Sequence, residues 1–156
     1  MLNKSDCGVY YLKEYTKDNS SDFTKDTLKS ILALRDDKEE AIDYYSKLLD
    51  ETLKDYALDE FDIVTSVPNN EEGYISEGMM RLLKKLSQSH ENLEFVQCLN
   101  REGNTINACY DDLKNKNILL FDYLATKGTS LNACKETLKS ADANLVVCIA
   151  LEKSSN

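Results

Sequence analysis

The sequence has no tryptophan, and it has only one proline and one histidine among its 156 residues. The histidine, His90, lies between Ser89 and Glu91 in a polar stretch, so we expect a surface position for it and no histidine-based catalysis. No hydrophobic run approaches the roughly 18 residues that cross a bilayer. The sequence therefore indicates neither a membrane span nor an active site built on histidine.

Positive charge is also scarce, since 19 basic side chains stand against 28 acidic ones and the formal net charge is −9. General binding to nucleic acid needs an excess of lysine and arginine that releases counterions from the phosphates. Binding to anionic membrane surfaces needs the same excess. We therefore expect no general nucleic-acid binding and no membrane partner, while a local basic pocket stays open as an alternative.

The five cysteines form no C-x-x-C pair, and their number is odd. This pattern favours neither a zinc site nor a compact disulfide framework. Cys98, Cys134 and Cys148 lie in apolar runs, where a free thiol packs as a small hydrophobic group. Together with a first segment, 1–8, that carries no apolar signal, this predicts a cytoplasmic protein with reduced, buried thiols.

Length and hydrophobic content predict one domain over residues 1–156, with 151–156 as a frayed tail. Strands rich in apolar or β-branched residues alternate with amphipathic helices, which predicts an α/β fold: a mainly parallel central sheet flanked by helices. The strands are expected at Val9–Tyr15, Phe61–Val67, Leu93–Leu99, Asn117–Asp122 and Asn144–Leu151. An apolar turn or short helix is expected at Leu28–Leu34, with Asp22 or Thr24 as cap. Further helices are expected at Lys38–Tyr56, after a Ser76 cap, and at Leu131–Ser140.

The segment 117–130, NILLFDYLATKGTS, carries the clearest chemical signal. A buried strand ends in Asp122, and a polar loop then leads into a helix at about Leu131. Ligands of open α/β sheets bind at the carboxyl ends of strands, and a helix N-terminus offers N–H groups to phosphate. Asp122 is placed to accept hydrogen bonds from ribose hydroxyls. Threonine, serine and glycine also fit an ordinary strand–loop–helix junction, so both interpretations stand at this point.

The stretch NILLFDYLATKGTSLNACKETLKSADANLVVCIAL resembles the phosphoribosyl-diphosphate (PRPP) binding region of type I phosphoribosyltransferases. In that family an apolar strand ends in two acids, and T-T-G-x-T and a helix follow. Asp122 matches the first acid, Thr126 the first threonine, Gly128 the glycine and Ser130 the last hydroxyl. Upstream, 30–53 resembles the helical lead-in of the small competence-associated (ComF-like) members.

Two positions depart from the family pattern, because Tyr123 replaces the second acid and Lys127 replaces the second threonine. The resemblance implies that ribose and its 5′-phosphate contact Asp122, Tyr123, Thr126, Lys127, Gly128, Thr129 and Ser130. The segment 62–68, DIVTSVP, resembles the family strand that leads to the pyrophosphate-binding loop, which implies roles for Ser66, Asn69 and Asn70. Arg101, in a loop expected over 101–112, is the best-placed basic residue and joins Asp122 as a candidate catalytic residue.

The implied activity is a phosphoribosyltransferase of nucleotide metabolism, a glycosyltransferase that moves the phosphoribosyl group of PRPP to a nitrogen acceptor and releases pyrophosphate. Mg²⁺ would enter with the pyrophosphate, and a homodimer fits the family pattern. The alternative is a catalytically inactive domain of the same fold that senses a nucleotide or phosphosugar or binds a protein partner. The acidic helix 38–56 offers a docking face for a third, purely interacting role.

Overall fold

The computed structural model describes residues 2–71 and 73–154. Its main sheet has six strands in the order β1-β2-β8-β7-β3-β4. They are β1 (Asn3–Lys4), β2 (Tyr10–Glu14), β3 (Ile63–Ser66), β4 (Glu94–Phe95), β7 (Asn117–Ala125) and β8 (Leu145–Lys153). All neighbouring pairs are parallel except β1 and β2. The expected mainly parallel sheet is therefore confirmed.

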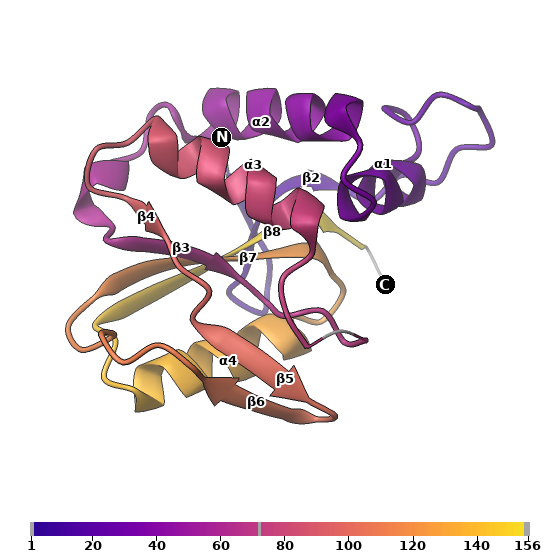
Figure 1. Cartoon of the computed structure of the whole chain (residues 1–156). Coiled ribbons are helices and arrows are strands. Elements are labelled where there is room, and N and C mark those ends of the chain that lie inside the picture. Colours follow the sequence, from indigo (N-terminus) through magenta and orange to yellow (C-terminus); the bar gives the residue numbers. More distant parts are fainter. Residues whose placement is uncertain (1, 72, 155–156) are drawn as a thin grey trace.

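In the described part of the chain, four α-helices and a small hairpin cover the two faces of this sheet (Figure 1). Helices α1 (Thr27–Arg35), α2 (Glu39–Leu53) and α3 (Glu77–Gln88) lie on one face, and a short 3₁₀ helix, Leu58–Glu60, follows α2. Helix α4 (Thr129–Ser140) and the hairpin of β5 (Leu99–Glu102) and β6 (Thr105–Ala108) lie on the other. Parallel strands need long crossover connections, and these helices supply them.

The central strand β7 shows how the sequence produces two cores. Its side chains alternate between the faces, so Leu119 and Phe121 pack under α1–α3 while Ile118 and Leu120 pack against α4. Because both faces of the sheet are covered, the sequence of this strand is an almost continuous apolar run. The first polar side chain after this run is Asp122, on the same face as Ile118 and Leu120.

Helix starts follow capping chemistry, with one correction. Ser76 caps α3 as expected, since its Oγ accepts the N–H of Met79 at 3.4 Å. The cap of α1 is Asp26, whose carboxylate accepts the N–H groups of Leu28 and Lys29. Asp22 bonds Thr24 in the preceding loop, so neither is the cap.

Three other expectations are wrong in part. The strand expected at 93–99 is interrupted, because only Glu94–Phe95 pairs with β3 before the chain turns into β5. The segment 101–112 is largely a hairpin rather than a loop, with Arg101 opposite Ile106. The chain end is not frayed at 151–153, since β8 continues to Lys153 and pairs with β2 and β7. Residues 155 and 156 lie outside the described residues.

The thiols at 98, 134 and 148 are free and buried, as expected. In the part of the chain that the structure describes, no helix has both the length and the apolar character required for a bilayer span.

Candidate functional site

A pocket of about 340 Å³ lies at the carboxyl ends of β3 and β7. Its walls come from α1, the loop after β3, strand β5, the end of β7 and the first turn of α4. The lining residues are Ile31, Arg35, Val67, Pro68, Asn69, Asn70, Arg101, Asp122, Tyr123, Leu124 and Ser130. Segments far apart in the sequence thus meet at the sheet edge where α/β proteins bind ligands.

Six of the eleven side chains predicted from the sequence line this pocket. They are Asn69, Asn70, Arg101, Asp122, Tyr123 and Ser130. The two proposed ends of the ligand site, 69–70 after β3 and 122–130 after β7, therefore share one cavity. Parallel pairing of β3 with β7, from Ile63 opposite Ile118 to Ser66 opposite Phe121, places the two strand ends side by side.

Asp122 and Arg101 form the polar centre of the pocket. The Asp122 carboxylate accepts the backbone N–H of Tyr123 at 2.8 Å. Burial raises the pKa of Asp122 to about 6, and the Tyr123 N–H and the nearby Arg101 charge oppose that rise. The guanidinium therefore lies close enough to influence the carboxylate, although the two form no ion pair within the described residues.

The Nε atom of Arg101 is buried and has no hydrogen-bond partner within residues 2–71 and 73–154. A buried donor without a partner is costly, and in native structures most such groups bond a protein atom, a water or an ion. The Arg101 backbone is fixed, since its N–H donates to Gly73 O at 3.0 Å. An anion in the pocket would provide the acceptor that this donor lacks.

Tyr123 contributes no acid where the family pattern has one. Alternation along β7 turns its side chain toward α3, and its hydroxyl hydrogen-bonds the Ser76 hydroxyl at the α3 cap. Of the described residues that line the pocket, Asp122 is therefore the one carboxylate. In the described residues, no group of three or more His, Cys, Asp or Glu side chains is placed to hold a metal ion.

The other predicted side chains lie away from the pocket wall. Ser66 is fully buried, and its Oγ donates to Phe121 O at 3.0 Å, which ties β3 to β7. Thr126, Lys127 and Thr129 are exposed at the loop that begins α4. Their positions leave them open to a ligand that extends out of the pocket past Ser130.

Gly128 has a structural role that the sequence interpretation did not include. It is buried and left-handed, with φ at 73°, and it caps α4 without any side-chain hydrogen bond. A Cβ placed there would meet Cys7 Sγ at 2.9 Å and Val9 Cγ2 at 3.0 Å. The glycine thus brings the loop against the turn before β2, rather than only opening it to an anion.

We expect Gly128→Ala to lower the free energy of unfolding by about 1–2 kcal/mol, because alanine is strained at this φ and crowds Cys7. Urea denaturation measures the loss. The matched control is Gly103→Ala, which has a similar φ of 60° and nothing within 4 Å of its Cβ. Equal losses in both variants would show that backbone strain acts alone and that the Cys7 contact is unimportant.

Arg35 and Ile31 are pocket residues that the site prediction missed. Both belong to α1, whose position depends on a close crossing with α3 at Gly78. Arg35 has no ion pair within the described residues, although Asp36 and Asp37 follow it directly. No local sequence signal marks Arg35, since only tertiary packing brings α1 to this edge of the sheet.

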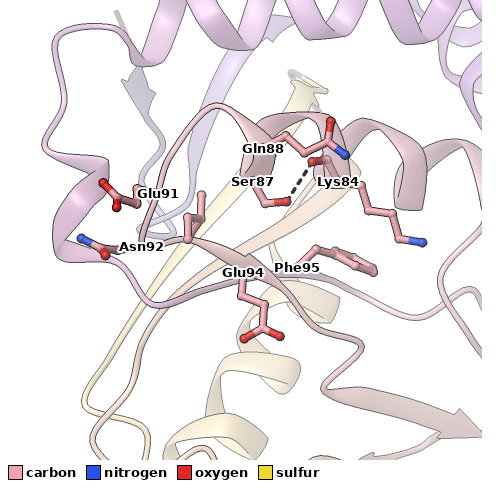
Figure 2. A pocket seen from close by; sticks show the side chains of 8 residues that line it. Lys84, Ser87, Gln88, Glu91, Asn92, Glu94 and Phe95 are labelled. Carbon is pink, nitrogen blue, oxygen red and sulfur yellow. Dashed lines mark hydrogen bonds between the residues drawn. The ribbon is translucent and has the colours of Figure 1, made fainter.

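Another hollow of the surface, about 670 Å³, lies between the end of α3 and β4 (Figure 2). Its labelled side chains diverge rather than converge, and they mix Lys84 with Glu91 and Glu94. The Lys84 ammonium sits 5.9 Å from the Phe95 ring centre. No predicted site residue lies here, and no set of polar groups points to a common ligand position.

No protein-family model matches the sequence, and a search of curated proteins finds no match. The fold matches UMP synthase from Leishmania donovani with a TM-score of 0.53 at 17% identity, over 83% of this chain and 25% of that protein. It matches phosphoribosylpyrophosphate synthetase from Mycobacterium smegmatis with a TM-score of 0.50 at 20% identity, over 70% and 33%. A purine phosphoribosyltransferase from Pyrococcus horikoshii gives 0.48 at 19% identity, over 72% of both chains.

The chain spans a third or less of the first two proteins. At these identities the matches show the fold, which is an α/β fold of the phosphoribosyltransferase type. The resemblance to that fold class, stated from the sequence, is confirmed. The narrower resemblance to the competence-associated members stays a prediction.

Proposed function

We propose that the pocket binds PRPP and that the protein transfers its phosphoribosyl group to a nitrogen acceptor. The observation that carries this proposal is the meeting of Asp122, Arg101 and the 69–70 loop in one cavity, beside the start of α4. This arrangement has a carboxylate for ribose hydroxyls, a cation for a diphosphate and a helix N-terminus for a phosphate. The fold of the matched structures supports the same assignment.

Each part of the ligand has residues suited to it. Asp122 would accept the ribose hydroxyls, with Tyr123 beside it. The 5′-phosphate would lie at the first turn of α4, where Gly128 supplies no capping side chain and leaves N–H groups for an anion. Thr126, Lys127, Thr129 and Ser130 would add hydroxyl and ammonium donors there. Asn69 and Asn70 would face the diphosphate.

In the proposed reaction, the acceptor nitrogen forms a bond to the anomeric carbon as the bond to pyrophosphate oxygen breaks. Positive charge develops on the sugar, and negative charge develops on the leaving diphosphate. Asp122 would hold the sugar in place, and Arg101 would stabilise the leaving group. No covalent nucleophile is required, which agrees with a pocket that has no Ser–His or Cys–His pair among its lining residues.

A second candidate is a catalytically inactive domain that senses a nucleotide or phosphosugar, or that binds a protein. The observation in its favour is Tyr123, whose hydroxyl bonds Ser76 where the family pattern has a second acid. Tyr123→Asp would restore that acid, so it should raise PRPP affinity in the presence of Mg²⁺ if the lost acid is what abolished catalysis. As part of the first proposal we expect a homodimer, and light scattering measures the molar mass that tests it.

Calorimetric titration with PRPP, with and without Mg²⁺, tests the proposal directly, and ribose 5-phosphate serves as the comparison ligand. Tighter binding of PRPP than of ribose 5-phosphate would support recognition of the diphosphate and justify a search for the acceptor. Equal binding of both would favour the sensor. Binding of neither at millimolar concentration would contradict both ligand-binding candidates.

We expect Asp122→Asn to weaken binding of ribose 5-phosphate about tenfold or more, because charge-assisted hydrogen bonds to the sugar are lost. Binding of inorganic pyrophosphate should not weaken, since the substitution removes a negative charge near Arg101. Titration of both ligands into the variant measures the contrast, with the exposed Asp111→Asn as control. Equal weakening for both ligands would place Asp122 outside the sugar site.

A further inference from the structure

The end of the pocket at Asn69 and Asn70, where we place the diphosphate, receives its positive charge from residues outside the loop after β3. The loop after β3, from Ser66 to Asn70, contains no basic residue. The two cations that line the pocket are Arg35 and Arg101, and neither forms an ion pair within the described residues. A diphosphate carries several negative charges, so these two guanidiniums are the groups available to neutralise it.

Arg35 lies at the same end of the pocket as Asn69. The two residues line the main pocket together, and they also line an adjoining hollow of about 270 Å³ whose other lining residues are Asp36, Asp37, Ser76 and Glu77. Arg101, on β5, is also close to the loop after β3, because its backbone N–H donates to Gly73 O. Asn69 thus lies near Arg35, and Gly73 lies next to Arg101.

A resident divalent ion would have few protein ligands in this pocket and a positive charge beside it. Mg²⁺ prefers oxygen ligands in octahedral geometry and is bound in proteins through one or two carboxylates with waters and substrate phosphates. Among the described residues that line the pocket, Asp122 is the one carboxylate, the lower limit of that range, and the nearby Arg101 charge opposes a second cation there. The position of a second acid is taken by Tyr123, which bonds Ser76.

We infer that Arg35 and Arg101 bind the diphosphate between them without a metal ion, and that Arg35 is the residue that distinguishes a diphosphate from a monophosphate. The position of the sugar in this inference rests on the proposed function. The diphosphate site is argued from Arg35 and Arg101 alone. Planar guanidiniums bind phosphate oxygens in pairs of hydrogen bonds, and they stay charged at every physiological pH. The unpaired Arg101 Nε gains an acceptor in the complex.

The test is calorimetric titration of the whole chain with inorganic pyrophosphate, PRPP and ribose 5-phosphate, each with Mg²⁺ and with EDTA. We expect pyrophosphate to bind in EDTA within about threefold of its affinity in Mg²⁺. Arg35→Gln should weaken pyrophosphate and PRPP about tenfold or more and leave ribose 5-phosphate unchanged. Arg35→Lys should restore part of the loss, since it keeps the charge and loses the paired geometry.

Lys84→Gln is the control for a lost positive charge, because Lys84 lines a hollow that shares no residue with this pocket. Melting curves show whether each variant is folded. Pyrophosphate binding that requires Mg²⁺ in the parent, or an Arg35→Gln variant that binds it like the parent, would overturn the inference. So would an absence of pyrophosphate binding under both conditions.

The outcomes also separate this inference from the proposed function. Metal-free pyrophosphate binding without any binding of PRPP or ribose 5-phosphate would support the diphosphate site and contradict the phosphosugar assignment. Binding of ribose 5-phosphate and of Mg²⁺–PRPP, with no pyrophosphate binding in EDTA, would support the proposed function and contradict the metal-free site.

Discussion

Gly78→Ala is expected to lower the free energy of unfolding by about 3 kcal/mol or more, the upper end of what overpacking costs. A Cβ on Gly78 would lie 1.5 Å from the carbonyl oxygen of Leu34, and that oxygen belongs to the α1 backbone. Neither helix can accommodate the methyl group by turning a side chain, so α1 and α3 must separate. Intrinsic helix propensity would predict the opposite sign, since alanine is favoured over glycine by about 1 kcal/mol.

Thermal unfolding measures this effect, and a loss of 3 kcal/mol in a chain of this size corresponds to roughly 6–12 °C in Tm. Gln88→Ala, an exposed substitution in the same helix, is the matched control and should change little. Because Leu34 precedes Arg35, we also expect weaker pyrophosphate binding by any Gly78→Ala protein that remains folded. A Tm at or above that of the parent would contradict the close crossing of α1 and α3.

The strand–loop–helix unit at 117–140 was predictable because its signals are local. An apolar run, an acid, a polar loop with glycine and an amphipathic helix follow one another within 24 residues, and the structure forms β7 and α4 there. The strand extends three residues beyond Asp122, to Ala125. That extension could not be foreseen, because pairing of Leu124 and Ala125 with β8 stabilises it.

The remaining features depend on contacts that are distant in sequence. Arg35 reaches the pocket because of the α1–α3 crossing at Gly78, and nothing near Arg35 in the sequence marks that crossing. The segment 101–112 was expected as a loop, since Glu102, Asn104 and Thr105 give no apolar alternation, but residues 99–108 form a hairpin. Its pairing, with Arg101 opposite Ile106, is what directs Arg101 toward Asp122.

Another buried acid, Glu152, lies on β8 opposite Leu124 in the register with β7. Its Oε1 is 3.6 Å from the Lys13 ammonium and accepts the Tyr45 hydroxyl at 3.3 Å, while its Oε2 is buried without a partner in the described residues. The Lys13 ammonium also donates to the Tyr44 hydroxyl at 2.8 Å. This cluster joins β2, β8 and α2 on the face away from α4.

Burial raises the pKa of Glu152 from 4.5 to about 7, and the charge of Lys13 and the hydrogen bond from Tyr45 oppose that rise. The folded state therefore favours the protonated acid. The stability that this preference contributes is fully present below about pH 4.5 and is lost as the pH rises through about 7. The predicted loss from this group alone is about 3 kcal/mol.

Glu152→Gln mimics the protonated acid and should abolish this loss. The quantity to compare is the free energy of unfolding of the parent minus that of the variant. We expect this difference to fall by about 3 kcal/mol between about pH 4.5 and about pH 8. Urea denaturation at both pH values measures the difference, which is independent of any constant cost of the substitution. Glu14→Gln, an exposed acid on the adjacent strand, should show no such change.

Lys13→Met separates the two contributions to the pKa of Glu152. The substitution removes the cation of the cluster, which lowers the pKa of Glu152. Only the Tyr45 hydrogen bond then opposes the effect of burial, so the pKa of Glu152 should rise further. The loss of stability should extend to higher pH than in the parent and become larger, because the ionised carboxylate has no counter-ion. If the parent and Glu152→Gln show the same pH dependence, Glu152 does not titrate near neutrality, and the Lys13 pair must hold it ionised throughout.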